Sequence, residues 1–147
     1  MPANRCARIA VIMSWVYVQA TGQLLAPDGT QAGLGYSGFA AGKNNPLLQD
    51  KIGVGPIPCG TYNIGEPECV PPDKPGPHGP YILRLIPDPA NMMFGRSGFL
   101  IHGDSIATPG TASHGCIIQA RAVRERIGTL RAADPDAATL RVVEKLA

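Results

Sequence analysis

Residues that interrupt regular structure are unusually common in this chain. Its 147 residues include 18 glycines and 15 prolines. Such a composition argues against a helical bundle, because glycine weakens a helix interior and proline removes one of its hydrogen bonds. Short strands joined by turns accommodate both residues. We therefore predict a mainly β, β-rich α+β fold with one or two short helices.

Apolar runs mark the expected strands. The clearest covers residues 81–86, which are apolar on both faces apart from Arg84, so we expect it near the middle of a sheet. Ala20–Gly22 is typical of a hairpin turn. Further strands are expected at residues 14–19, 23–25, 33–39, 61–64 and 139–143. Residues 66–80 contain six prolines and two glycines, which predict a surface loop without regular structure.

One amphipathic helix is expected after residue 120, covering one face of the sheet. Its apolar face consists of Ala122, Val123, Ile127 and Leu130, and its polar face of Arg121, Arg124, Glu125 and Arg131. The sequence Asp134–Asp136 contains a proline and predicts the end of this helix.

Charge and hydropathy exclude some classes of function. The net charge is only +2, and no cluster of lysines and arginines carries interleaved aromatic residues, so a nucleic-acid binder is not expected. An apolar run at residues 9–18 follows Arg5 and Arg8 and is too short to span a membrane. A short signal peptide and a strand are the two alternatives for this run. We predict an N-terminal extension over residues 1–12 and a single domain over residues 13–147.

Two short blocks, residues 99–104 and 113–118, carry the candidate chemistry. A thiol becomes a good nucleophile only as the thiolate, so Cys116 needs a basic neighbour, and His102 is the candidate. Small, polar and turn-forming residues between the blocks can double the chain back and bring the two side chains together. Gly115 allows a substrate to approach the backbone, and the amides of Gly115 and Cys116 could hold an oxyanion.

The pattern His-Gly, a loop and then Ser-His-Gly-Cys before an apolar residue resembles the L,D-transpeptidase (YkuD-type) family of peptidoglycan enzymes. The resemblance implies a compact catalytic domain built as a β-sandwich or barrel, with no cofactor and no metal. It also implies that Cys116 attacks a stem-peptide carbonyl, that His102 is the base and that His114 lines the site. Gly103 and Ser113 belong to the same motifs and are expected to bind substrate or support the oxyanion. The family often has Arg or Asn two residues after the cysteine, where this chain has Ile118.

A narrower resemblance covers most of the chain from Met13 onward. It rests on the segments 13–22, 35–38, 43–46, 55–58, 60–62 and 93–99. These resemble a compact transpeptidase-like group whose characterised relatives are antibacterial type VI secretion effectors. The resemblance implies L,D-carboxypeptidase and D-amino-acid exchange activity on tetrapeptide stems in the periplasm of a target bacterium. It further implies two partners, the secretion machinery and a cognate immunity protein.

Tyr36 and Arg96 are further candidates for the site, whereas His78 is not expected to belong to it. Tyr36 either faces the substrate or packs at a sheet edge. Arg96 either binds the carboxylate that ends a stem peptide or forms a structural bridge to Asp88 or Asp104. His78 lies in the proline-rich loop and is expected to face solvent.

The cysteines outside the two blocks could form one disulfide bond. In an oxidising periplasm Cys59 and Cys69 could form a disulfide, which we favour over two independent thiols, while Cys6 is expected to stay free.

Other functions compete with the transpeptidase interpretation. His102, His114 and Cys116 could bind zinc, but their spacing does not match a common zinc motif. Papain-like enzymes place the cysteine before the histidine, which is the reverse of the order found here. The remaining alternatives are a housekeeping cross-linking transpeptidase and a non-catalytic module that binds the cell wall.

Overall fold

The fold is mainly β, as the sequence predicts. The computed structural model describes residues 14–70 and 78–147, so the predicted extension at residues 1–12, with Cys6 and most of the possible signal peptide, lies outside the described residues. The strands are β1 (Trp15–Val18), β2 (Gln23–Leu25), β3 (Gln31–Leu34), β4 (Tyr36–Ser37), β5 (Gly60–Ile64), β6 (Glu68–Cys69), β7 (Tyr81–Pro87), β8 (Leu100–His102), β9 (Ile117–Ile118) and β10 (Thr139–Val143). The helices are α2 (Arg121–Ala133) and three short 3-10 helices, Ala40–Gly42, Pro46–Leu48 and Pro135–Ala138.

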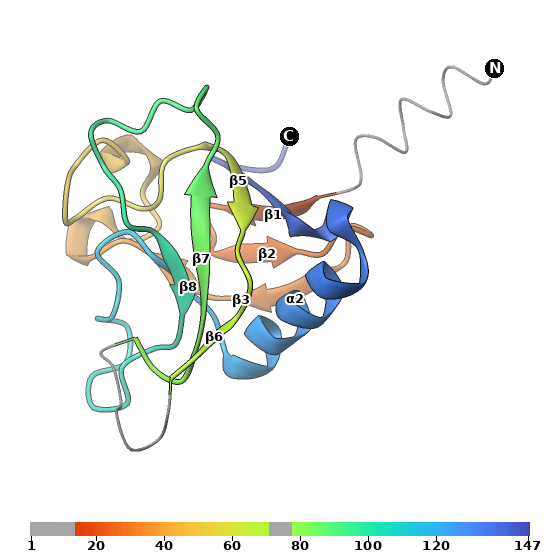
Figure 1. Ribbon diagram of the computed structural model, residues 1–147. Helices are drawn as coiled ribbons and strands as arrows, with labels where there is room; N and C mark the ends of the chain where they lie inside the picture. Colours follow the sequence, from red (N-terminus) through yellow and green to blue (C-terminus); the bar gives the residue numbers. More distant parts are fainter. Residues whose placement is uncertain (1–13, 71–77) are drawn as a thin grey trace.

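The strands form one sheet that nearly closes on itself. Its order is β3-β2-β1-β10-β5-β7-β8-β9-β4, with β6 added beside β7. In Figure 1, β5, β7 and β8 run steeply across β1, β2 and β3, as expected of a strongly curled sheet. The two outer strands of this order, β3 and β4, are separated in sequence by Gly35 alone. The predicted strand at residues 33–39 is therefore wrong as one unit, because the chain bends at Gly35 between two strands.

Gly35 is required at this bend by close packing. A Cβ atom at this position would collide with the carbonyl group of Ile118 in β9. Any residue with a side chain would therefore push β9 away from the bend.

The centre of the sheet joins segments from both ends of the described chain. β1 pairs in parallel with β10, with Trp15 beside Leu140, and β10 pairs antiparallel with β5. The β1–β2 hairpin is confirmed, as is the internal position of β7, which pairs with β5, β6 and β8. The short strand β6 lies in the segment predicted to lack regular structure, and that prediction is wrong for Glu68–Cys69 because they pair with the start of β7.

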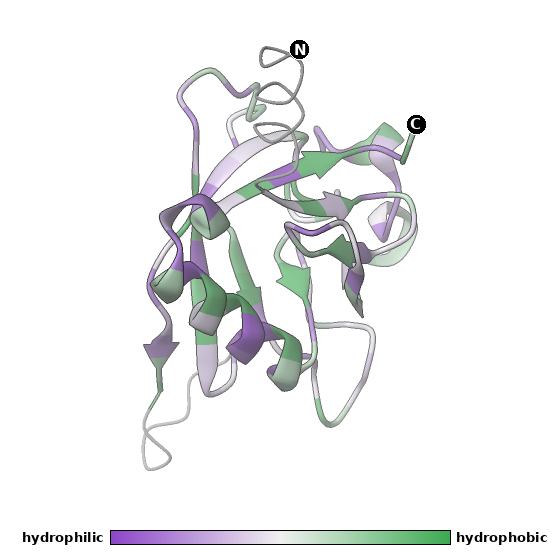
Figure 2. Cartoon of the chain, turned by 90° about the vertical axis from the view of Figure 1, so that its right-hand side faces the viewer, coloured by the Kyte–Doolittle hydropathy of each residue, from purple (hydrophilic) through white to green (hydrophobic). Residues whose placement is uncertain are grey.

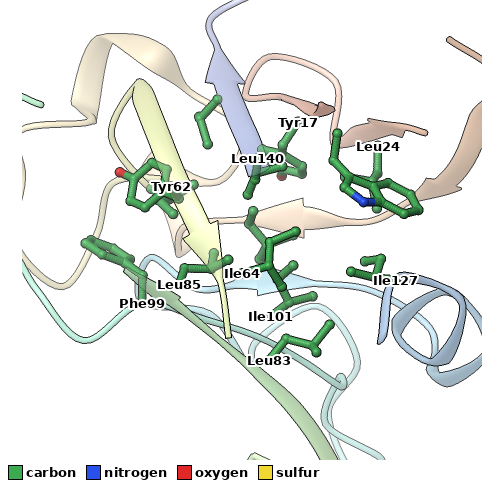
Figure 3. Close-up of a cluster of buried hydrophobic side chains, with 14 of the residues drawn as sticks. Tyr17, Leu24, Tyr62, Ile64, Leu83, Leu85, Phe99, Ile101, Ile127 and Leu140 are labelled. Carbon is green, nitrogen blue, oxygen red and sulfur yellow. The ribbon is translucent and has the colours of Figure 1, made fainter. Parts of the chain in front are cut away.

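The core lies inside the curled sheet and beneath α2. Figure 3 shows side chains from six strands of the sheet meeting there: Tyr17 of β1, Leu24 of β2, Ile64 of β5, Leu83 of β7, Ile101 of β8 and Leu140 of β10. Ile127 of α2 is fully buried against them. The Trp15 indole Nε1 donates to the Ala137 carbonyl at 2.9 Å, which ties β1 to the segment after α2.

The predicted amphipathic helix is confirmed, with two corrections. Ala122, predicted on the apolar face, is exposed. Both polar and apolar residues are visible on α2 in Figure 2. Arg124, predicted on the exposed polar face, is only 3% exposed. Its guanidinium donates through Nε to the Tyr81 carbonyl at 2.7 Å and through Nη1 to the Gln119 carbonyl at 2.6 Å. These contacts tie α2 to the start of β7 and to the residue after β9.

The predicted disulfide between Cys59 and Cys69 is absent, and both thiols are free. Cys69 pairs with Tyr81 at the start of β7, whereas Tyr62, three residues after Cys59, pairs with Pro87 at its end. Six residues of strand place the two cysteines roughly 20 Å apart or more, far beyond the reach of a disulfide. The Cys59 thiol instead donates to Gln19 Oε1 at 3.3 Å.

No helix within residues 14–70 and 78–147 has the length and apolar character needed to cross a membrane.

Candidate active site

The parallel pair β8–β9 brings the two predicted catalytic blocks together. Ile101 pairs with Ile117 and His102 with Ile118, so Cys116, the residue before β9, lies beside Leu100. Because side chains alternate along a strand, His102 projects from the same face of β8 as Leu100. The register therefore places His102 and Cys116 on the same side of the β8–β9 pair.

His102 and Cys116 line the same small cavity, of about 190 Å³, which we call the Cys116 cavity. Its lining residues are His78, Ser97, Gly98, Phe99, His102, Ala112, His114, Gly115 and Cys116. All three histidines of the sequence therefore contribute to its wall.

His102 has the tautomer and charge state of a general base. Its Nδ1 lies 2.8 Å from the Gly103 carbonyl, which can only accept, so Nδ1 carries the proton and the lone pair is on Nε2. The ring is only 2% exposed. Burial lowers the pKa of His102, and the nearby charges of His78 and Arg124 lower it further. The imidazole is therefore neutral at neutral pH.

Cys116 is a protonated thiol in the resting site. Burial raises the pKa of Cys116, and this effect outweighs the Leu100 amide and Arg96, which both act to lower the pKa. The Leu100 amide donates to Sγ at 3.3 Å. A neutral thiol beside a neutral imidazole means that the thiolate must form by proton transfer during the reaction.

Ser113 holds the turn that presents the thiol. Its fully buried hydroxyl donates to the Cys116 carbonyl at 2.5 Å and accepts from the amides of Gly38 at 2.9 Å and Gly115 at 3.1 Å. The Gly115 amide is therefore already engaged, and the predicted oxyanion site is reduced to the amide of Cys116.

Gly115 is fixed as glycine by two constraints. Its φ is +143°, a conformation that residues with a side chain rarely adopt. A Cβ atom would also lie 2.6 Å from Nη2 of Arg96 and 2.7 Å from Cε1 of Phe99.

Arg96 lies at the site but has neither of its two predicted roles. Its Nη1 donates to the carbonyls of Gln49 and Pro56, both at 2.7 Å. Its Nη2 donates to Gly55 at 2.9 Å and His114 at 3.1 Å. Arg96 is only 7% exposed, and main-chain carbonyls occupy its guanidinium. Within the described residues it forms no ion pair with Asp88 or Asp104. Its donors are therefore not available to bind a substrate carboxylate.

The other two histidines differ from each other. His114 is exposed, and its Nδ1 lies 2.9 Å from the Gly53 carbonyl at the rim of the cavity. His78, predicted to face solvent, instead packs on His102 with ring centroids 4.7 Å apart. That prediction is wrong for the ring of His78, which is half-buried and lies against the imidazole of His102.

A larger cavity, the second cavity, has a volume of about 520 Å³. It is lined by Leu34, Gly35, Tyr36, Gly79, Pro80, Gly103, Asp104, Ile106, Ile118, Gln119, Ala120, Arg121 and Arg124. Sequence neighbours line different cavities: His78 and His102 line the Cys116 cavity, whereas Gly79 and Gly103 line the second cavity.

Tyr36 lies at a sheet edge, which is one of the two positions predicted for it. It lies in the outer strand β4 and also lines the second cavity. Its hydroxyl donates to Asp104 Oδ1 at 2.5 Å and accepts from the Ala112 amide at 3.0 Å, so it holds both ends of the loop between β8 and the Ser113 turn. Burial and the bond to Asp104 raise the pKa of Tyr36 to about 12, which keeps the hydroxyl protonated.

The described residues offer no set of ligands for the zinc site that the sequence left as an alternative. Within the described residues, no three His, Cys, Asp or Glu side chains are grouped closely enough to hold a metal ion.

A family model described as the Tlde1 domain matches residues 32–136, well over half of the chain. The chain belongs to the Tlde1 domain family. This family is associated with type VI secretion effectors, so the narrower resemblance is confirmed at that level. The matched Tlde1 segment contains Tyr36, Arg96, all three histidines and Cys116. Neither the curated proteins nor the solved structures compared with the chain gave a match.

Proposed function

We propose that this Tlde1 domain is a cysteine enzyme that modifies peptidoglycan tetrapeptide stems, as an L,D-carboxypeptidase and as an L,D-transpeptidase that exchanges the terminal D-amino acid. The observation that carries the proposal is the presence in one cavity of the Cys116 thiol and a neutral His102 whose Nε2 carries the lone pair. Membership of an effector family supports an antibacterial role.

The first half-reaction forms a thioester. The Cys116 thiol transfers its proton to Nε2 of His102 as Sγ attacks the carbonyl carbon of the third stem residue, meso-diaminopimelate. The carbon–nitrogen bond to the terminal D-alanine then breaks, and the imidazolium returns the proton to the departing amine. The Cys116 amide supports the negative oxygen of the tetrahedral intermediate.

The second half-reaction releases the thioester. An acceptor gives its proton to Nε2 of His102 and attacks the carbonyl carbon, the carbon–sulfur bond breaks, and the proton passes to Sγ. Water as acceptor yields a tripeptide, and an amine yields exchange or a cross-link. His114 at the rim lines the substrate's path in this proposal. Ser113 holds the main chain of the nucleophile Cys116, and the Gly103 carbonyl orients the base His102. Arg96 holds the main chain of His114 in the turn before Cys116.

Two alternatives remain as competing proposals. A housekeeping transpeptidase would use the same cavity, but the Tlde1 assignment favours an effector. A non-catalytic wall-binding module would have no reason to keep a thiol beside a tautomer-fixed imidazole.

The test is turnover of a purified tetrapeptide muropeptide, followed by mass spectrometry. Cys116→Ala is expected to abolish conversion to tripeptide, while Cys69→Ala, a change at an exposed cysteine in β6, is expected to keep it. Thermal unfolding of both variants checks that the fold is intact. Unchanged trimming by folded Cys116→Ala would contradict the assignment of the nucleophile.

A further inference from the structure

In the described part of the chain, the ring of His102 has a main-chain carbonyl as its hydrogen-bonding partner and no side chain. Its Nδ1 lies 2.8 Å from the carbonyl of Gly103, the next residue. Enzymes that activate a thiol or hydroxyl with a histidine commonly orient the histidine with a third group, often a carboxylate. Asp104 does not supply it, because its carboxylate is engaged by the Tyr36 hydroxyl and by main-chain amides. Packing must therefore fix the orientation of the ring.

The ring of His78 provides such packing. Its centroid lies 4.7 Å from that of His102, and the two ring planes are tilted by 59°. This separation and tilt are typical of a favourable contact between aromatic rings. Because His102 is only 2% exposed, the contact is made where almost no water reaches the base.

His78 also shares the cavity of the nucleophile. It lines the Cys116 cavity together with His102 and Cys116, and its own side chain is half-buried. The two half-reactions described above use no group of His78, although it contacts the base directly.

The ionisation of His102 depends on groups from several elements. Those that act on it or share its cavity are His78, Asp104, His114, Cys116 and Arg124. Burial is the main cause that lowers the pKa of His102; the charges of His78 and Arg124 lower it further, and the charge of Asp104 opposes them. The ring of His78 takes part in this burial, so its removal should weaken both effects.

We propose that His78 is a positioning residue whose ring holds the imidazole of His102 against the Gly103 carbonyl, so that the base keeps one orientation and one tautomer as it exchanges protons with Cys116. The inference rests on the proposed function, in which His102 is the base, and adds a residue to its machinery.

NMR of the imidazole nitrogens in the full chain tests the effect on the base without any substrate. The sequence contains three histidines, so a His102→Gln variant assigns the His102 signals. In His78→Ala we expect the pKa of His102 to rise toward the ordinary value of about 6.5, because the ring loses its cover. The Nδ1–H tautomer should also become less dominant. His78→Phe keeps a ring in place and should leave both close to those of the unchanged chain, since burial is the larger cause.

Turnover of the tetrapeptide muropeptide tests the effect on the reaction. His78→Ala should lower kcat at least about ten-fold with little change in KM, because proton transfer depends on the placement of the base. The acid limb of kcat/KM should move to higher pH, in step with the NMR titration, and His78→Phe should restore most of kcat. Pro80→Ala is the matched control, because it changes an exposed position of the same segment that does not line the Cys116 cavity, and it should leave kcat and the His102 signals unchanged.

Thermal unfolding checks that each variant is folded, and His78→Gln, which also removes the ring, replaces His78→Ala if that variant is not. An unchanged pKa and tautomer of His102 in the folded variant overturns the inference and leaves the proposed function standing. Equal losses of kcat in His78→Ala and His78→Phe also overturn it, since the imidazole of His78 would then take part in the reaction itself. A change confined to KM would make His78 a substrate contact and overturn it too. If the NMR result is as expected but the unchanged chain cleaves no muropeptide, the positioning of His102 by His78 stands and the proposed function is overturned.

Discussion

At the scale of single residues, the environment of His102 determines how the activity should depend on pH. Burial and neighbouring positive charge lower its pKa, so the imidazole stays neutral, and able to accept a proton, to a lower pH than an exposed histidine. Activity should therefore fall only when the pH drops below about 6.5, the ordinary histidine value. The acid limb of kcat/KM against pH measures this. An acid limb centred above that value would contradict the assigned charge state.

Gly115 provides a second prediction at this scale. Gly115→Ala should lower the free energy of unfolding by about 1–3 kcal/mol through backbone strain alone, with a further loss because the new methyl group meets Arg96 and Phe99. Gly29→Ala is the matched control, since Gly29 also has a positive φ, +89°, but no atom lies within 4 Å of its Cβ position. Denaturant unfolding of both proteins measures the difference. Equal losses would show that the space around Gly115 does not matter.

At the scale of structural elements, Arg96 joins the loop at residues 49–56 to the Ser113 turn. Arg96→Met leaves four main-chain carbonyls without their charged donor, so we expect a loss of about 3 kcal/mol or more in unfolding free energy. Arg84→Met removes an exposed arginine that pairs with Glu68 and should have little effect. Urea unfolding of the two variants provides the comparison, and a near-neutral Arg96→Met would refute the bridging role.

Elements that depend on neighbouring residues could be predicted from the sequence, and elements that depend on distant ones could not. The β1–β2 hairpin, β7 and α2 follow from local patterns of apolar and turn residues. The approach of His102 to Cys116 was predictable because a short, turn-rich loop joins their strands. The burial of Arg124 was not, because its partners Tyr81 and Gln119 lie on other elements that no periodicity of the helix reveals.

In the candidate site too, contacts between distant segments could not be predicted from the sequence. Arg96 was placed near the active site, but its partners are main-chain carbonyls of a distant loop, which side-chain chemistry alone does not indicate. The contact between His78 and His102 and the separation of Cys59 from Cys69 both involve β7 or the residues just before it. The pairing of β7 with its neighbours, which local patterns do not show, thus bears on two predictions that proved wrong.

At the scale of the whole molecule, the proposed effector role predicts toxicity that depends on compartment. A chain directed to the periplasm of a sensitive bacterium by a fused signal peptide should inhibit growth, because its proposed substrate lies there, and the same chain kept in the cytoplasm should not. Growth curves of the two strains, with Cys116→Ala in the periplasm as the control, test this. Toxicity from the cytoplasmic form, or toxicity that survives the loss of Cys116, would contradict the effector role.

The parallel pairing of β1 with β10 has a consequence for how the protein reaches its native state. Trp15 and Leu140 are neighbours in the sheet although almost the whole described chain separates them in sequence. Local hairpins can form early, but the middle of the sheet must wait for one encounter between distant segments, which carries a large loop-closure entropy. We therefore expect slow, cooperative refolding, and a chain cut in a connecting loop should retain no half that folds alone.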